Sequence, residues 1–172
     1  RAFMTAGAGF DEVMTYSFAF DPLLDRLGAR PVARLELHNP ISGEMPGLRT
    51  HLVPNLLGVL ERNAHEEDRL GVFEIGRVFG VERTDEGLPV QPTTLGALVA
   101  TREKLDGPEL FMELKGILGG LARSVGRPTP QLIQGGTDVP WAHPVRQAVL
   151  TCDGESLGAL YEVHPLTLHQ LD

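Results

Sequence analysis

The sequence has few cysteines and no long apolar runs. Cys152 is the single cysteine among 172 residues, so no disulfide can form within the chain, and a reducing compartment suits such a composition. No apolar run approaches the roughly 20 residues that a membrane-spanning helix needs, and the first residues lack the layout of a signal peptide. We therefore expect a cytoplasmic chain that makes no membrane contact.

Positive charge is also scarce. Lys104 and Lys115 are the only lysines, and the formal net charge is −8. A protein that grips nucleic acid by itself usually carries a basic face or a run of Lys and Arg. We therefore expect little direct contact with RNA. The length and the hydrophobic fraction of 42% are typical of one globular domain spanning residues 1–172.

The pattern of apolar residues predicts an α+β fold with a largely antiparallel sheet flanked by helices. In residues 13–20, alternation predicts a strand with Met14 and Tyr16 on its inward face. Helices are expected from Asp21-Pro22, from Pro54 and over residues 109–125. Asp153-Gly154 predicts a type I′ turn between two strands within residues 145–163. Further strands are expected at residues 33–38, 72–79 and 95–100.

Six short segments occur in an order and spacing typical of one protein family. They are Gly9 to Phe18, Asn39-Pro40-Ile41-Ser42 with Leu48-Arg49-Thr50, Phe73-Glu74-Ile75-Gly76-Arg77-Val78-Phe79, Leu114-Lys115-Gly116, His143-Pro144-Val145-Arg146, and Glu162-Val163-His164-Pro165. Together they resemble the catalytic-like module of the beta subunit of bacterial phenylalanyl-tRNA synthetase.

The resemblance implies a core like that of class II synthetases which does not itself catalyse the reaction. It further implies an alpha2-beta2 enzyme that charges tRNA(Phe) with phenylalanine, using ATP and Mg²⁺ at an active site in the alpha subunit. The chain would be a fragment of a larger beta subunit, without its editing and anticodon-binding domains. Its expected role is that of a scaffold and subunit interface.

The residues themselves argue against catalysis. Class II enzymes hold the ATP α-phosphate with an arginine in an aromatic-Arg-x-acid pattern, because a fixed cation stabilises charge at phosphorus. Here Gly80 occupies that position, after Phe79. Arg77 is expected on the opposite face of the strand and Arg83 in a loop, so neither is a good substitute. We therefore predict no catalytic, cofactor-binding or metal-binding residues.

Several residues are instead candidates for structural or interface roles. Arg49 either fixes the interface with the alpha subunit or covers its own loop at the surface. Glu74 lies in an apolar strand and, if buried, needs Arg49 or Arg77 as a partner. His143 and His164 are expected to meet across the base of the hairpin. The remaining interface candidates are Phe10, Tyr16, Asn39 and Pro40, within two segments, residues 3–10 and 39–52, that we expect to expose apolar side chains.

Two other functions remain open from the sequence. The chain could be an autonomous enzyme that uses the class II fold to adenylate a small acid, or a free-standing binding module. The enzyme would need phosphate-binding arginines, and after Arg146 the chain has no Arg or Lys at all. Titration with a nucleotide separates the enzyme from the other two functions.

Overall fold

The computed structural model describes residues 1–105 and 108–171. A π-helical turn, Phe3–Gly7, opens the chain. The helices are α1 (Asp21–Arg26), α2 (Val53–Asn63), α3 (Glu109–Ser124) and α4 (Pro165–His169). The strands are β1 (Asp11–Glu12), β2 (Phe18–Ala19), β3 (Gly47–Leu48), β4 (Arg69–Arg77), β5 (Thr93–Thr101), β6 (Gln131–Gln134), β7 (Ala142–Cys152) and β8 (Glu155–Val163). No helix among these described residues is long and apolar enough to cross a membrane.

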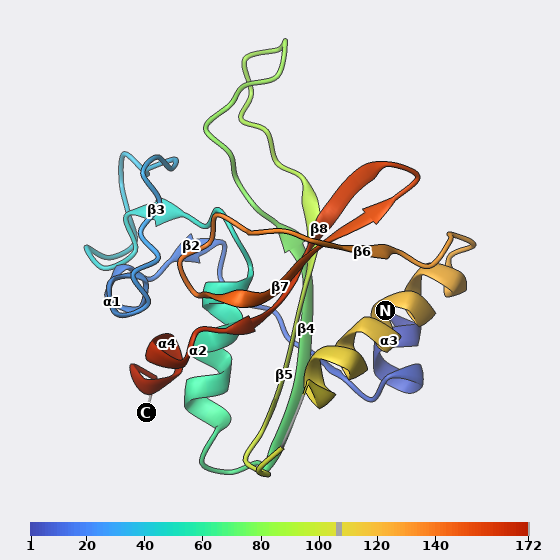
Figure 1. Ribbon diagram of the computed structural model, residues 1–172. Helices are drawn as coiled ribbons and strands as arrows, with labels where there is room; N and C mark the ends of the chain where they lie inside the picture. Colours follow the sequence, from blue (N-terminus) through green and yellow to red (C-terminus); the bar gives the residue numbers. More distant parts are fainter. Residues whose placement is uncertain (106–107, 172) are drawn as a thin grey trace.

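The strands form two three-stranded sheets and one short pair. The first sheet has the order β1-β4-β5, with β1 parallel and β5 antiparallel to β4. The second has the order β6-β7-β8 and is antiparallel throughout, and β2 pairs with β3. Figure 1 shows α2 and α3 flanking the long β4–β5 ribbon. The α+β class and the largely antiparallel pairing are therefore confirmed.

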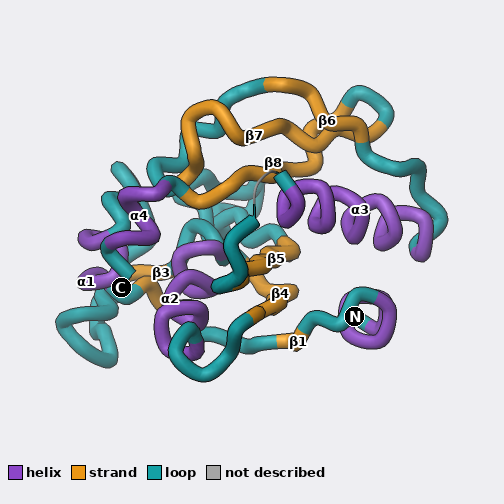
Figure 2. The backbone as a smooth tube through the Cα atoms, turned by 60° about the horizontal axis from the view of Figure 1, so that its bottom comes forward, coloured by secondary structure: helices purple, strands orange, loops and turns teal. Residues whose placement is uncertain are grey.

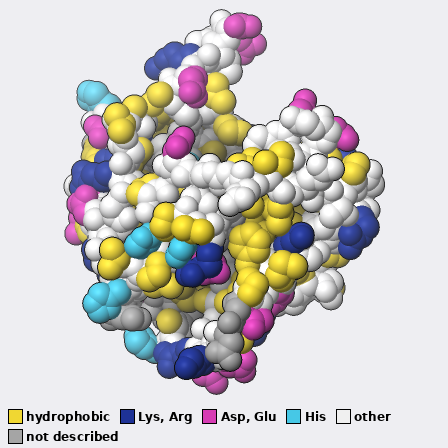
Figure 3. Space-filling view, in the orientation of Figure 1, with side chains coloured by type: hydrophobic (Ala, Val, Ile, Leu, Met, Phe, Trp, Pro, Cys, Tyr) yellow, Lys and Arg dark blue, Asp and Glu magenta, His cyan; other side chains and the backbone are white. Residues whose placement is uncertain are grey.

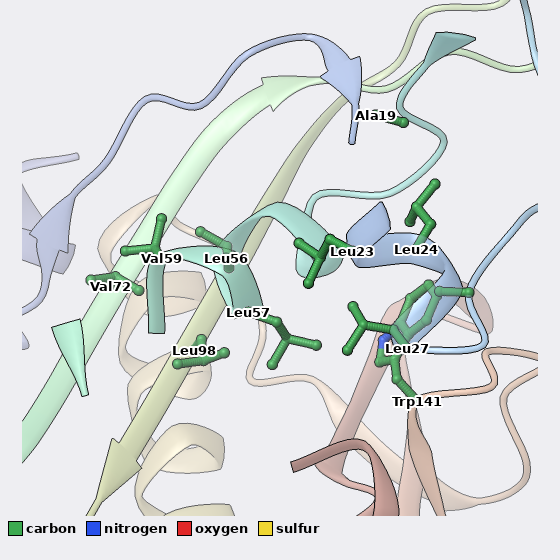
Figure 4. Packing of buried hydrophobic residues seen from close by; sticks show 11 residues of the cluster. Ala19, Leu23, Leu24, Leu27, Leu56, Leu57, Val59, Val72, Leu98 and Trp141 are labelled. Atoms are coloured by element: carbon green, nitrogen blue, oxygen red, sulfur yellow. The ribbon is translucent and has the colours of Figure 1, made fainter. Parts of the chain in front are cut away.

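The main core lies around α2. Pro54 stands in the first turn of this helix, where its missing N–H costs no hydrogen bond. Leu56 and Leu57 are fully buried. Figure 4 shows them facing the leucines of α1 and the side chains of β4 and β5. Leu56 and Leu57 thus form the inward face of this helix, which begins near Pro54 as predicted.

A second, smaller cluster corrects one prediction. Met4, Phe10 and Phe73 are buried together, and α3 covers them only with part of its apolar stripe. Phe10 is 4% exposed, so the prediction that residues 3–10 form an exposed surface is wrong for both Met4 and Phe10. Leu118 on α3 is half-buried, because the larger core forms around α2 instead.

The strand predicted over residues 13–20 is also wrong. Within it, only Phe18 and Ala19 pair, as β2, while β1 precedes it at Asp11–Glu12. The side chains of Met14 and Tyr16 are 93% and 74% exposed, while Thr15 points inward. The reversal follows from hydrogen bonding, because the Thr15 hydroxyl contacts the buried carboxylate of Glu74. Leaving a buried charge without polar partners costs more free energy than exposing a methionine side chain to solvent.

The segment 33–38 forms a single bridge, between Glu36 and Gly47, rather than the predicted strand. Its Arg34 side chain instead reaches the buried carboxylate of Asp21. A side-chain ion pair therefore fixes this segment together with two backbone hydrogen bonds, from Leu37 to Pro46 and from Leu48 to Leu35. The predicted turn between β7 and β8 is confirmed, since Asp153 and Gly154 have φ angles of 52° and 82°.

Candidate functional site

The most connected polar group of the chain is the Arg49 guanidinium, which is buried. Its Nη1 atom lies 2.8 Å from Oε1 of Glu74, and the two side chains are each 4% exposed. Nε donates to the carbonyl of Arg77 at 3.0 Å, and Nη1 donates to that of Tyr16 at 3.3 Å. Arg49 is therefore not a surface residue that covers its own loop, which corrects that alternative. Glu74 takes Arg49, and not Arg77, as its partner.

Thr15 completes this network. Its hydroxyl donates to Oε2 of Glu74 at 2.6 Å and accepts from Nη1 of Arg49 at 2.8 Å. The amide of Asn55, on the first turns of α2, donates to the same hydroxyl at 3.0 Å and to the carbonyl of Tyr16 at 2.9 Å. Three segments far apart in the sequence, around Thr15, over residues 49–55 and around Glu74, are thus tied at one point. We name Thr15, Arg49, Asn55 and Glu74 the Arg49 network.

Gly76 makes room for this network. A β-carbon at this position would overlap Nη2 of Arg49 and lie 2.9 Å from Oε1 of Glu74. Because real β-carbons do not come so close to such atoms, the guanidinium requires glycine here. Sequence reasoning missed Thr15, Asn55 and Gly76. The spacing of Glu74 and Gly76, which lie on the same face of a strand, was the signal that could have identified the glycine.

A second buried ion pair uses the same arrangement. The carboxylate of Asp21 is 6% exposed and accepts from both Nη atoms of Arg34. This hydrogen bonding lowers the pKa of Asp21 below its ordinary value of 3.8, against the opposing effect of burial. Arg34 lies over Gly47, where a β-carbon would overlap its guanidinium. Arg34 therefore ties the 30–36 segment to α1.

The positions examined for nucleotide binding do not converge on a site. Gly80 pairs through its N–H with the carbonyl of Val90 at 3.0 Å. Arg77 is exposed and its Nη1 reaches the side chain of Gln91 at 3.5 Å. Arg83 donates to the carbonyl of Gly87 at 2.7 Å, within the loop that contains both. Arg77 and Arg83 are thus held by neighbours on the β4–β5 connection.

The two His-Pro segments meet as expected. The rings of His143 and His164 stack with centroids 6.1 Å apart. Nδ1 of His143 accepts the N–H groups of Val145 and Arg146, and Nδ1 of His164 accepts that of Leu166 at the start of α4. Each ring thereby caps a local backbone turn. Their arrangement supports a structural role at the base of the hairpin.

A second group of aromatic residues lies beside this pair. Trp141 donates to the Tyr161 hydroxyl at 2.7 Å, and the ring of His51 meets Trp141 edge-on. Burial raises the pKa of Tyr161 and lowers that of His51.

Burial and the adjacent Asp153 carboxylate raise the pKa of the Cys152 thiol, which disfavours the thiolate form. Within residues 1–105 and 108–171, no group of three or more His, Cys, Asp or Glu could hold a metal ion.

The remaining candidates differ in exposure. Phe10 is buried in the second cluster, Tyr16 is exposed, Asn39 is exposed, and Pro40 is half-buried. Among the predicted interface residues, Tyr16 is the one that the Arg49 network holds directly, through its carbonyl.

The overall arrangement of helices and sheets is that of the class II synthetase fold. A solved structure of pyrrolysyl-tRNA synthetase from Desulfitobacterium hafniense superposes with a TM-score of 0.71 over 98% of this chain and 59% of that one, at 15% sequence identity. At this identity the likeness defines the fold alone.

The sequence comparisons define the family more narrowly. All residues, 1–172, match the profile described as "Phenylalanyl tRNA synthetase beta chain CLM domain", and the chain belongs to this family. It is 32% identical to the phenylalanine–tRNA ligase beta subunit of Syntrophus aciditrophicus, over 97% of this chain and 22% of that protein. It is 35% identical to the protein of the same name from Symbiobacterium thermophilum, over 93% of this chain and 19% of that protein. The chain thus spans about a fifth of the length of these relatives.

Proposed function

We propose that this chain is a non-catalytic scaffold and subunit-interface module of a phenylalanine–tRNA ligase. The complete enzyme would charge tRNA(Phe) with phenylalanine, using ATP and Mg²⁺ bound outside this module. The observation that carries the proposal is the closed Arg49 network. A buried arginine in a class II fold is here neutralised by Glu74 and bonded to backbone carbonyls, so it serves the fold instead of a phosphate group.

The same network supports a specific interface. It holds Thr15 inward and thereby directs Met14 and Tyr16, on either side of it, into solvent. Large apolar side chains that stand nearly fully exposed on a fixed segment are typical of a surface made for a partner. Tyrosine is also enriched among residues that dominate interface energies. We infer that Met14 and Tyr16 contact the alpha subunit.

One experiment tests the absence of nucleotide chemistry. Isothermal titration of the chain with ATP and phenylalanine should give no saturable heat. Binding tighter than about 100 μM, or roughly −5.5 kcal/mol, would instead favour an autonomous adenylating enzyme.

A second experiment tests the interface, with the full-length beta subunit that carries this module and its alpha subunit. Met14→Ser with Tyr16→Ser should weaken their association about 10- to 100-fold, since interface anchors of this kind carry much of the binding energy. Val125→Ser with Leu166→Ser is the matched control, because these side chains are 67% and 68% exposed but lie directly after α3 and on α4. Equal losses in both variants would refute the assignment.

A further inference from the structure

A paired arm projects from the body between β4 and β5. Gly80 donates to the carbonyl of Val90, Val90 donates to that of Glu82, and Thr84 donates to that of Leu88. Figure 1 shows the arm, residues 78–92, rising from the ends of the two strands beyond the other elements. It therefore has a defined shape, although it lies outside both hydrophobic clusters.

This arm has no apolar core to cover. Residues 81–88 are all exposed, among them Val81 and Leu88, which are 45% and 58% exposed. An isolated two-stranded hairpin is marginally stable at best in water. An ordered arm with exposed apolar side chains gains stability if a partner covers it. The arm is thus a docking element rather than a connection of minimal length.

The charge of the arm selects the kind of partner. Asp85 and Glu86 lie in the turn of the arm, and Glu82 lies on its paired part, opposite Val90. Figure 3 shows acidic side chains at the top of the molecule. The one cation there, Arg83, is bonded to the carbonyl of Gly87. RNA phosphates would be repelled by this excess of negative charge. A protein surface rich in Lys or Arg is complementary to it.

We propose that the arm docks on a basic surface of the alpha subunit, an inference that rests on the proposed function. Its base is continuous with the surface around Met14 and Tyr16. The carbonyl of Arg49 accepts from the N–H of Phe79 at 3.0 Å, and the N–H of Arg49 donates to the carbonyl of Ser17 at 2.9 Å. One buried residue therefore fixes both the arm and the segment that presents Tyr16, so a single partner can engage the two together.

The test uses the full-length beta subunit that carries this module and its alpha subunit. Glu82→Lys, Asp85→Lys and Glu86→Lys reverse the charge of the arm. Glu66→Lys, Glu67→Lys and Asp68→Lys are the matched control, since they make the same change in net charge at three exposed residues between α2 and β4. Association is measured by surface plasmon resonance at several salt concentrations, and thermal unfolding verifies that both variants fold.

The arm variant should weaken association about 10- to 100-fold, mainly through slower binding, and should lessen or reverse the dependence on salt. The control should stay within about threefold of the parent. Equal losses in both variants would mean that only total charge matters, and no loss in the arm variant would remove the arm from the interface. Either result would overturn the proposal.

A photo-cross-linking amino acid in place of Leu88 gives a second, independent readout in the complex with tRNA present. Cross-linking to a Lys- or Arg-rich peptide of the alpha subunit is expected. Cross-linking to the tRNA alone would overturn the proposal in favour of an RNA contact. If the parent subunits do not associate at all, the proposed function fails. If they associate but Leu88 cross-links to neither, only the arm inference fails.

Discussion

The Arg49 network predicts an unequal response to removal of its two charged members. If Arg49→Met is made, the buried carboxylate of Glu74 keeps only the Thr15 hydroxyl as a donor. If Glu74→Gln is made, the guanidinium keeps the carbonyls of Arg77 and Tyr16 and the Thr15 hydroxyl as acceptors. An unpaired buried charge is costly, and more so with fewer hydrogen bonds. Removal of the arginine should therefore destabilise the fold more.

The magnitudes follow from burial. Both side chains are 4% exposed, so Arg49→Met should cost about 3–5 kcal/mol of unfolding free energy, as for other broken buried pairs. Glu74→Gln should cost about 1–3 kcal/mol, because most hydrogen bonds remain. In a chain of this size, about 3–5 kcal/mol corresponds to a fall of roughly 6–20 °C in the melting temperature.

The assay is equilibrium unfolding in urea, followed by circular dichroism. Arg146→Met is the control, since the pair between Arg146 and Glu162 lies at the surface and should be worth at most about 1 kcal/mol. The double variant of Arg49 and Glu74 should lose less than the sum of the single variants, because the two charges interact directly. A larger cost for Glu74→Gln than for Arg49→Met would refute the reasoning.

Two further predictions concern the core and the acid response. Leu57→Ala, at a fully buried site, should cost about 2–5 kcal/mol, whereas Leu118→Ala at its half-buried site on α3 should cost clearly less; equal shifts in urea midpoint would contradict this order. Because Arg34 lowers the pKa of Asp21 in the folded state, the pair stabilises the fold fully above the ordinary carboxyl pKa of 3.8, and this contribution is lost as the pH falls through the lowered value. Asp21→Asn should therefore lower stability at pH 7 and make the loss of stability below about pH 4 less steep. If acid denaturation of this variant has the same pH dependence as that of the parent, the pair does not cause that loss.

Local chemistry explains which elements were predictable from the sequence. The turn at Asp153-Gly154 is specified by two adjacent positions that must adopt positive φ, and the start of α2 by Pro54. The contact between His143 and His164 followed from register, since each precedes a proline at one end of the same hairpin. In each case, the signal lies in a few neighbouring residues.

The orientation of residues 14–16 shows why other features could not be predicted from neighbouring residues. Alternation placed Met14 and Tyr16 inside, because the apolar face of a strand normally meets the core. The deciding contact joins Thr15 to Glu74, 59 residues away. Periodicity also failed to locate the larger core, because the strongly periodic apolar stripe of α3 lies over the smaller cluster. Periodicity predicted the elements, and distant polar contacts determined the orientation of Thr15.

The two buried ion pairs share one arrangement of side chains. Arg49 and Arg34 each lie against a glycine, Gly76 and Gly47, and each tethers a segment that has little regular hydrogen bonding of its own. Arginine is suited to this role, because its several hydrogen bonds have fixed directions. Arg49 also bonds through its backbone to Phe79, at the base of the arm, and to Ser17, beside Tyr16. The shape of both surfaces is therefore set within the chain before any partner binds.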